Sequence, residues 1–120
     1  MLEGALIIES LRVGVVLDDP GFVVRRLSRT VPTHVTPEQP DVWTLLEFRS
    51  DSADPDRLAE SLSRVLDGPD WYASLHSDGQ VYVVFPSRVF CYALDDDARH
   101  EEALAHARSV GVPNEQCDWR

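Results

Sequence analysis

Lysine is absent from this chain, and all of its basic charge comes from 11 arginines. A Walker-type phosphate loop needs a lysine after its glycine-rich turn, so the ordinary P-loop machinery is excluded. The sequence also has no G-x-G-x-x-G dinucleotide motif and no G-x-S-x-G nucleophile elbow. We therefore expect no catalytic residue and no cofactor.

Cysteine is scarce, because Cys91 and Cys117 are the only two in the sequence. Two cysteines are too few for a disulfide framework. Cys91 lies in an apolar run, which predicts a small core residue. A Cys91–His76 pair across neighbouring strands is the alternative, and an activated thiolate is not expected because the nearest arginine in sequence is Arg88.

Long apolar runs are missing as well, and none approaches the ~20 residues that a membrane-spanning helix needs. The first residues, Met1–Gly4, contain no basic side chain, and the apolar run Ala5–Ile8 ends at Glu9. These features are not those of a secretory signal. The sequence predicts a cytoplasmic protein with no membrane partner.

Negative charge is plentiful, with 21 carboxylates and a net charge of −10. Binding to nucleic acid or to an anionic membrane relies on positive surface, so neither is expected. The acidity is compatible with a basic protein partner, and equally with solubility alone. Lysine avoidance together with abundant alanine, valine, aspartate and arginine is typical of a GC-rich coding genome.

Metal-ligating side chains do not form a motif. His100 and His106 are six residues apart, which does not place them on one helical face, whereas Glu102 and His106 are four apart and share one. That pair predicts a surface ion pair rather than two metal ligands. The run Asp95–Asp97 predicts a helix cap, since it lacks the offsets and the glycine of a calcium loop. No metal is expected.

The N-terminal third predicts strands and turns. Ala5–Arg12 is strand-like, and the segments Val13–Leu17 and Phe22–Thr30 flank Asp18-Asp19-Pro20-Gly21, which predicts a hairpin. Three prolines in Val31–Asp41 predict an extended surface connection, long enough to make contacts of its own.

The remaining chain predicts four strands and two helices. A first helix begins with Asp54 as N-cap and Pro55 at the first helical position, and it ends at Gly68-Pro69. A second helix covers about residues 98–110. The expected strands are Val42–Arg49, Trp71–His76, Val81–Phe85 and Arg88–Leu94, with turns at Asp78-Gly79 and Pro86-Ser87.

Residues 81–94 are apolar on both faces of the expected strands, which predicts a sheet covered on both sides. If side chains alternate between the two faces without interruption, Phe90 and Tyr92 lie on the same face as Tyr82 and Val84. We expect a single α+β domain over residues 1–120, an antiparallel sheet with two helices on one face. This is a ferredoxin-like variant with an added N-terminal hairpin. The other face of the sheet is then covered by the N-terminal strands or by another protein surface.

The series WTLLEF, WY, VYVVFP, RVFCY and GVP is similar to small bacterial proteins, and this resemblance implies no activity. Aromatic side chains near the sheet favour a partner interface or a ligand pocket in which Arg25 or Arg88 fixes an anion. The candidate contact residues are Trp43, Trp71, Tyr72, Tyr82, Tyr92, Arg25, Arg88 and His76. The first hypothesis is a non-enzymatic protein-interaction module acting as a homodimer, with neutralisation of a basic partner as one version. The alternative is a small-molecule-binding domain or small ferredoxin-like enzyme.

Overall fold

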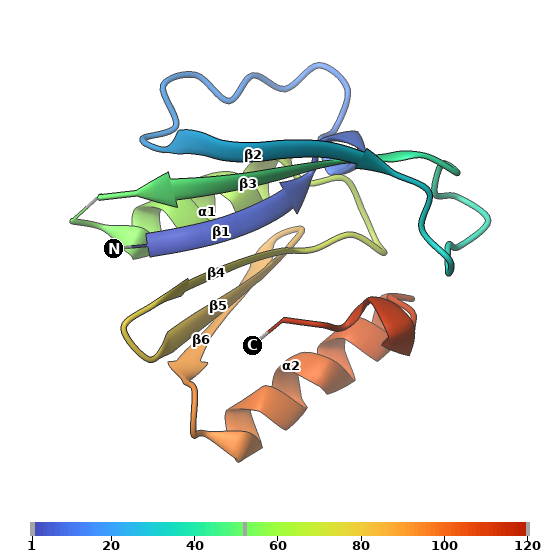
Figure 1. Cartoon of the computed structure of the whole chain (residues 1–120). Helices are drawn as coiled ribbons and strands as arrows, with labels where there is room; N and C mark the ends of the chain where they lie inside the picture. The colour runs from blue at the N-terminus through green and yellow to red at the C-terminus, as the bar shows by residue number, and fades with distance from the viewer. Residues whose placement is uncertain (1, 52, 120) are drawn as a thin grey trace.

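A computed structural model describes residues 2–51 and 53–119 of the chain (Figure 1). These residues form one six-stranded sheet, two α-helices and two short 3-10 helices. The strands are β1 (Leu2–Ile7), β2 (Val23–Thr30), β3 (Trp43–Ser50), β4 (Ala73–Ser77), β5 (Gln80–Phe85) and β6 (Arg88–Ala93). The helices are α1 (Pro55–Val65), α2 (Asp97–Ser109), η1 (Ile8–Ser10) and η2 (Asn114–Gln116).

The sheet has the order β2-β3-β1-β4-β5-β6, and every neighbouring pair of strands is antiparallel. The first strand of the chain therefore lies inside the sheet, between β3 and β4 (Figure 1). The edges are β2 and β6. An α+β protein with an antiparallel sheet and two helices is confirmed.

The two helices pack on opposite faces of the sheet. Leu58 and Leu62 of α1 share a core with Val84 of β5, whereas Ala103 and Ala107 of α2 share a core with the other face of β5. Successive residues of a strand point to opposite faces, so residues 81–85 of β5 are all apolar because a helix covers each side. The prediction of both helices on one face, and with it the ferredoxin-like packing, is wrong.

Strand β6 shows why the predicted faces were grouped wrongly. The two-residue turn Pro86-Ser87 pairs Phe85 with Arg88 and Val83 with Phe90. Residues directly opposite each other share a face, so the turn shifts the alternation by one residue. Phe90 and Tyr92 consequently pack under α2 with Val83, and not with Tyr82 on the other face.

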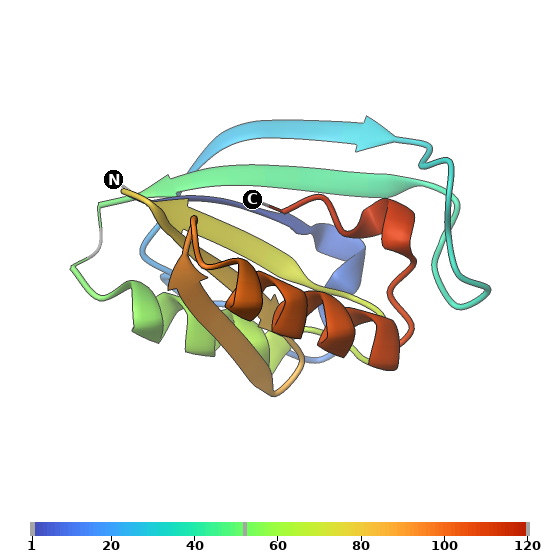
Figure 2. The ribbon, with the colours of Figure 1, turned by 90° about the horizontal axis from the view of Figure 1, so that it is seen from below.

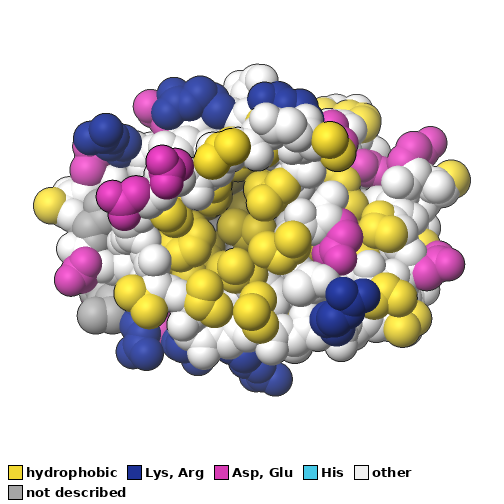
Figure 3. All heavy atoms as spheres, turned by 90° about the horizontal axis from the view of Figure 1, so that it is seen from above, with side chains coloured by type: hydrophobic (Ala, Val, Ile, Leu, Met, Phe, Trp, Pro, Cys, Tyr) yellow, Lys and Arg dark blue, Asp and Glu magenta, His cyan; other side chains and the backbone are white. Residues whose placement is uncertain are grey.

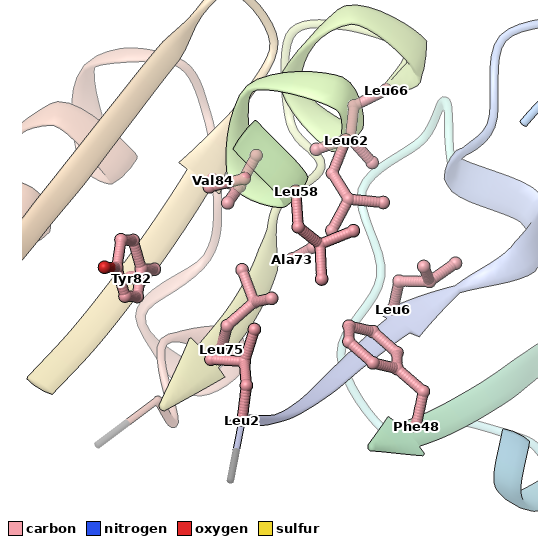
Figure 4. Close-up of a cluster of buried hydrophobic side chains, with 11 residues drawn as sticks. Leu2, Leu6, Phe48, Leu58, Leu62, Leu66, Ala73, Leu75, Tyr82 and Val84 are labelled. Atoms are coloured by element: carbon pink, nitrogen blue, oxygen red, sulfur yellow. The ribbon is translucent and has the colours of Figure 1, made fainter. Parts of the chain in front are cut away.

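The core under α1 is rich in leucine and contains one phenylalanine and one tyrosine (Figure 4). The helix begins as predicted, because the Asp54 side chain accepts a hydrogen bond from the Arg57 amide at 3.1 Å and Pro55 follows it. Leu58 and Leu62 then point from the helix toward Leu75 of β4, and Phe48 of β3 closes the far side of the cluster. Fully burying each leucine contributes about 1.5–3 kcal/mol.

The core under α2 contains a short polar chain. The indole Nε1 of buried Trp119 donates to the Tyr92 hydroxyl at 2.9 Å, and that hydroxyl lies 2.9 Å from Nδ1 of His100. Because the hydroxyl already accepts from Trp119, its own proton is available for His100. Trp119 thus fastens the C-terminal segment to the sheet.

His106 lies inside this core instead of on the helix surface. Its ring is 4.6 Å from Phe85 and 5.5 Å from Phe90, and its Nε2 is buried with no hydrogen-bond partner among the described residues. Burial, and secondarily the positive charge of Arg88, lowers the pKa of His106. Glu102 pairs with Arg99 at 2.9 Å, so the predicted Glu102–His106 pair is wrong.

The predicted N-terminal hairpin is also wrong. Residues 13–17 form no strand, and β2 pairs with β3 at the sheet edge, while β1 pairs with β3 and β4. The turn residues do adopt left-handed backbone, with φ of 47° at Asp19 and 81° at Gly21. These two residues end an irregular segment instead of joining two paired strands. Strand β2 pairs along its length with β3, which follows it after a long connection.

Removing the Tyr92 hydroxyl should destabilise the fold. We expect Tyr92→Phe to lower the free energy of unfolding by about 1–3 kcal/mol, because it leaves a buried indole N–H and an imidazole nitrogen unpaired. Urea unfolding measures the change. In a Trp119→Phe background the same substitution should cost less, and equal costs in both backgrounds would refute the chain of bonds.

His106 should make the fold sensitive to mild acid. Its folded pKa lies below the unfolded value of about 6.5, so the unfolded chain binds the proton more readily. Stability is therefore full above about pH 6.5 and falls as the pH drops through that value. Urea unfolding at several pH values should show this slope, and His106→Leu should flatten it. The exposed-site variant His76→Asn is the control and should keep the slope.

Candidate functional site: a cavity and an apolar surface

A cavity of about 390 Å³ lies on the α2 side of the sheet, over strands that α2 does not reach. Its floor comes from β1, β3 and β4, and its walls come from the connection after β2 and from the C-terminal segment. Figure 2 shows this segment turning back from α2 along the sheet. The lining residues are Ala5, Leu6, Ile7, Thr30, Pro32, Thr33, His34, Trp43, Leu45, Trp71, Tyr72, Ser74, Glu115, Gln116 and Asp118.

Aromatic rings form one side of the cavity. The rings of Trp43 and Trp71 lie 5.2 Å apart with an interplanar angle of 58°. The indole Nε1 of Trp43 donates to the Pro40 carbonyl at 3.0 Å, which fixes the ring. Tyr72 packs edge-on against Trp119 at 4.9 Å, so the cavity adjoins the core under α2.

Gln116 and Gln39 hold the two walls together. Nε2 of Gln116 donates to the His34 carbonyl at 2.7 Å and to Oε1 of Gln39 at 2.9 Å. Nε2 of the buried Gln39 donates to the Asp70 carbonyl at 3.1 Å. The long connection therefore makes contacts of its own, as its length predicts.

Tyr72 fixes a carboxylate at the edge of the cavity. Its hydroxyl donates to Oδ1 of Asp118 at 2.7 Å and contacts the Gln116 carbonyl. Burial, followed by the bond to Asp118 and its negative charge, raises the pKa of Tyr72. The hydroxyl thus remains a proton donor at neutral pH and orients Asp118.

Three of the eight candidate contact residues meet in this cavity, namely Trp43, Trp71 and Tyr72. Tyr82 is buried in the core under α1 and Tyr92 in the core under α2, so each is covered by this chain's own helix. A partner has no access to these two rings in the folded chain.

The three basic candidates lie apart from the cavity and from one another. Arg25 on β2 pairs with Glu47 at 3.2 Å. The guanidinium of Arg88 lies over the Phe90 ring at 4.6 Å, a cation–π contact, and His76 is exposed on β4. None of them lines the cavity, so they do not fix an anion there.

Sequence reasoning did not find Gln39, Glu115, Gln116 or Asp118. These polar residues lie in a proline-containing connection and in the segment after α2, where no periodicity applies. Their meeting depends on a contact between residues 77 apart in the chain. No local sequence pattern predicts a contact between residues so far apart in the chain.

The two cysteines lie in different parts of the fold. Cys91 is exposed on the α1 side of β6, so the prediction of a core residue is wrong. His76 pairs with Val81 and therefore faces the α2 side, which excludes the Cys91–His76 pair. Cys117 packs against the core under α2, and burial raises its thiol pKa. Both thiols are free.

A second feature is an exposed aliphatic surface, which we call the β2 apolar surface. It is formed by Val13, Val16, Val24 and Leu27. Val13 and Val16 are 99% and 80% exposed, and Leu27 is 61% exposed. Figure 3 shows apolar side chains gathered around a hollow on this side of the molecule, with charged groups around them.

This surface is open because α1 does not reach the β2 edge. Phe22 stacks on Phe48 at 4.2 Å, and Leu11 and Leu17 pack partly against the core under α1. The irregular segment 11–22 therefore covers the end of the core only in part. The apolar interior continues to the molecular surface there.

Among the described residues, no group of three or more His, Cys, Asp or Glu side chains is placed to hold a metal ion. Within the same residues, no helix has the length and apolar character needed to cross a membrane. Comparison of the chain with protein-family models, with curated proteins and with solved structures found no match.

Gln116 should be worth more to stability than its surface position suggests. We expect Gln116→Ala to lower the free energy of unfolding by about 1–3 kcal/mol, because the buried Gln39 amide loses a partner. Urea unfolding tests this. Gln80→Ala, at an exposed position on β5, is the matched control, and an equal effect of both substitutions would contradict the role of Gln116 in joining the walls.

Proposed function

We propose that this protein is a non-enzymatic protein-interaction module that associates with a second copy of itself through the β2 apolar surface. The observation that supports this most is the exposure of four aliphatic side chains, two in the irregular segment and two on the α1 side of β2. Large contiguous apolar patches are rare on monomers and typify association sites. A second copy would supply the layer that α1 leaves missing over β2 and β3.

The local charge argues against a basic partner at this surface. Residues 11–31 contain four arginines and two aspartates, whereas the whole chain has a net charge of −10. Two acidic molecules repel each other least where carboxylates are sparse. A basic partner would instead require an acidic surface, which makes the neutralisation of a basic partner the weaker version of the proposal.

The association we propose uses side chains and not strand pairing. Arg25, Arg26 and Arg29 lie on the edge strand, and the β3 register shifts at Arg25 as a bulge. A two-fold antiparallel pairing of β2 centred on Arg26 would place that residue opposite itself. Centring the pair on Leu27 would place Arg25 opposite Arg29. Both registers oppose like charges, which discourages edge-to-edge contact.

The proposed interface consists of aliphatic residues, whereas the sequence predicts an aromatic face of the sheet. Tyr82 and Tyr92 lie in the two cores, so they contribute nothing to a surface. The apolar segment Val13–Leu17, which the sequence assigns to a hairpin arm, takes their place in the proposal.

A second candidate function is small-molecule binding, and the cavity between β1, β3, β4 and the C-terminal segment favours it. Its volume of about 390 Å³ lies within the ~300–1,000 Å³ of typical ligand sites. This function is independent of the dimer, since the lining residues are distinct from those of the β2 apolar surface.

Charging the β2 apolar surface should separate the copies. We expect light scattering of the unaltered chain to give twice the mass of one chain, falling on dilution. The double variant Val13→Asp with Val16→Asp should raise the dimer dissociation constant at least about tenfold, because two apolar contacts are lost. Both positions lie in the irregular segment, so folding should be unaffected.

Leu94→Asp is the matched control, because Leu94 is an exposed leucine outside this surface. It should leave the dimer unchanged. A monomer at every concentration, or equal weakening by the control, would refute the homodimer.

A further inference from the structure

We infer that the cavity beside Trp43 and Trp71 binds an organic cation, a small molecule with an apolar body and one ammonium or amidinium group. This inference rests on the second candidate function and does not depend on the dimer. It assigns the chemical class of the ligand from the charge, the rings and the size of the site.

The charge of the lining is negative. Glu115 and Asp118 contribute carboxylates from the C-terminal wall. Among the described residues that line the cavity none is arginine, and the chain has no lysine. His34 also lines the cavity, where its backbone carbonyl accepts from the Gln116 amide. An anion would find two carboxylates and no guanidinium to pair with.

The rings of the lining suit a positive charge as well. Trp43 and Trp71 are inclined at 58° to each other with centroids 5.2 Å apart, so their surfaces form a corner. Tyr72 adds a third ring beside them. An indole face is the strongest aromatic partner for a cation, and a corner of rings beside a carboxylate combines both attractions.

The groups that would hold the cation are fixed before it arrives. The Tyr72 hydroxyl donates to Oδ1 of Asp118, and the Pro40 carbonyl holds the Trp43 indole. The Gln116 side chain bridges the two walls of the cavity. Preformed contacts of this kind reduce the entropy lost on binding.

The floor determines the rest of the ligand. Ala5 and Ile7 of β1 and Leu45 of β3 present aliphatic surface, so the body of the ligand should be apolar. The cavity of about 390 Å³ accommodates a small molecule of this kind. A lysine side chain of a peptide shares the charge but offers a longer, thinner body.

Three probes of nearly equal shape test the charge directly. Benzyltrimethylammonium is the cation, neopentylbenzene is its neutral isostere, and phenylacetate is an anion of similar size. Titrations followed by the indole N–H signals of Trp43 and Trp71 in ¹H–¹⁵N spectra locate the binding. We expect the cation to bind at least about fivefold more tightly than the isostere, and phenylacetate to bind more weakly still.

Two substitutions test the assigned groups. Asp118→Asn keeps an oxygen that accepts from Tyr72 but removes the charge, so it should weaken the cation at least about threefold and leave the isostere unchanged. Trp43→Leu should also weaken the cation. Asp95→Asn, which removes an exposed carboxylate before α2, is the matched control and should have no effect.

The outcomes distinguish failure of the cation class from failure of small-molecule binding itself. If the isostere or phenylacetate binds as tightly as the cation, or Asp118→Asn changes nothing, the cation class is overturned while small-molecule binding stands. If no probe shifts either indole signal in a saturable way, both are overturned. If a peptide with an N-trimethylated lysine binds more tightly than benzyltrimethylammonium, the small-molecule source is overturned.

Discussion

The constraint on which this structure depends is that two helices must cover two faces of a six-stranded sheet. One helix on each face explains why Val81–Phe85 is apolar throughout, since each of these five side chains of β5 enters a core. A single helix is too narrow to cover six strands, which are spaced about 4.8 Å apart. Each face is therefore left partly uncovered, and both candidate sites lie on those uncovered areas.

Different segments of the chain lie over the two uncovered areas. On the α2 side, the proline-containing connection and the C-terminal segment meet over β1 and β3, joined by Gln39 and Gln116. They border a cavity that combines apolar surface with a few polar groups. On the α1 side, Arg12 donates to the Arg64 carbonyl and the Gly21 carbonyl accepts from Ser50, while Val13 and Val16 between them remain in solvent. A concave cavity suits a small ligand, whereas an open aliphatic surface suits another protein surface.

The sequence predicts those elements whose signals are local. Both helices begin at the expected aspartate caps, and the Asp78-Gly79 turn has the positive φ values that a tight hairpin needs. The pairing of β1 with β3 and β4 and the placement of the helices depend on long-range contacts, which leave no periodicity. The cavity is the extreme case, because its aromatic residues were identifiable while its carboxylates came from an irregular segment.

The position of β1 inside the sheet has a consequence for synthesis of the chain. Leu2 pairs with Ser50, and Glu3 pairs with His76, so this strand is made long before either neighbour exists. Contacts of such sequence separation slow folding, because a long loop must close before they form. Until then Leu2 and Leu6, which end in the core, remain in contact with water or a chaperone. Conditions that slow translation beyond residue 50 should therefore favour aggregation of the nascent chain.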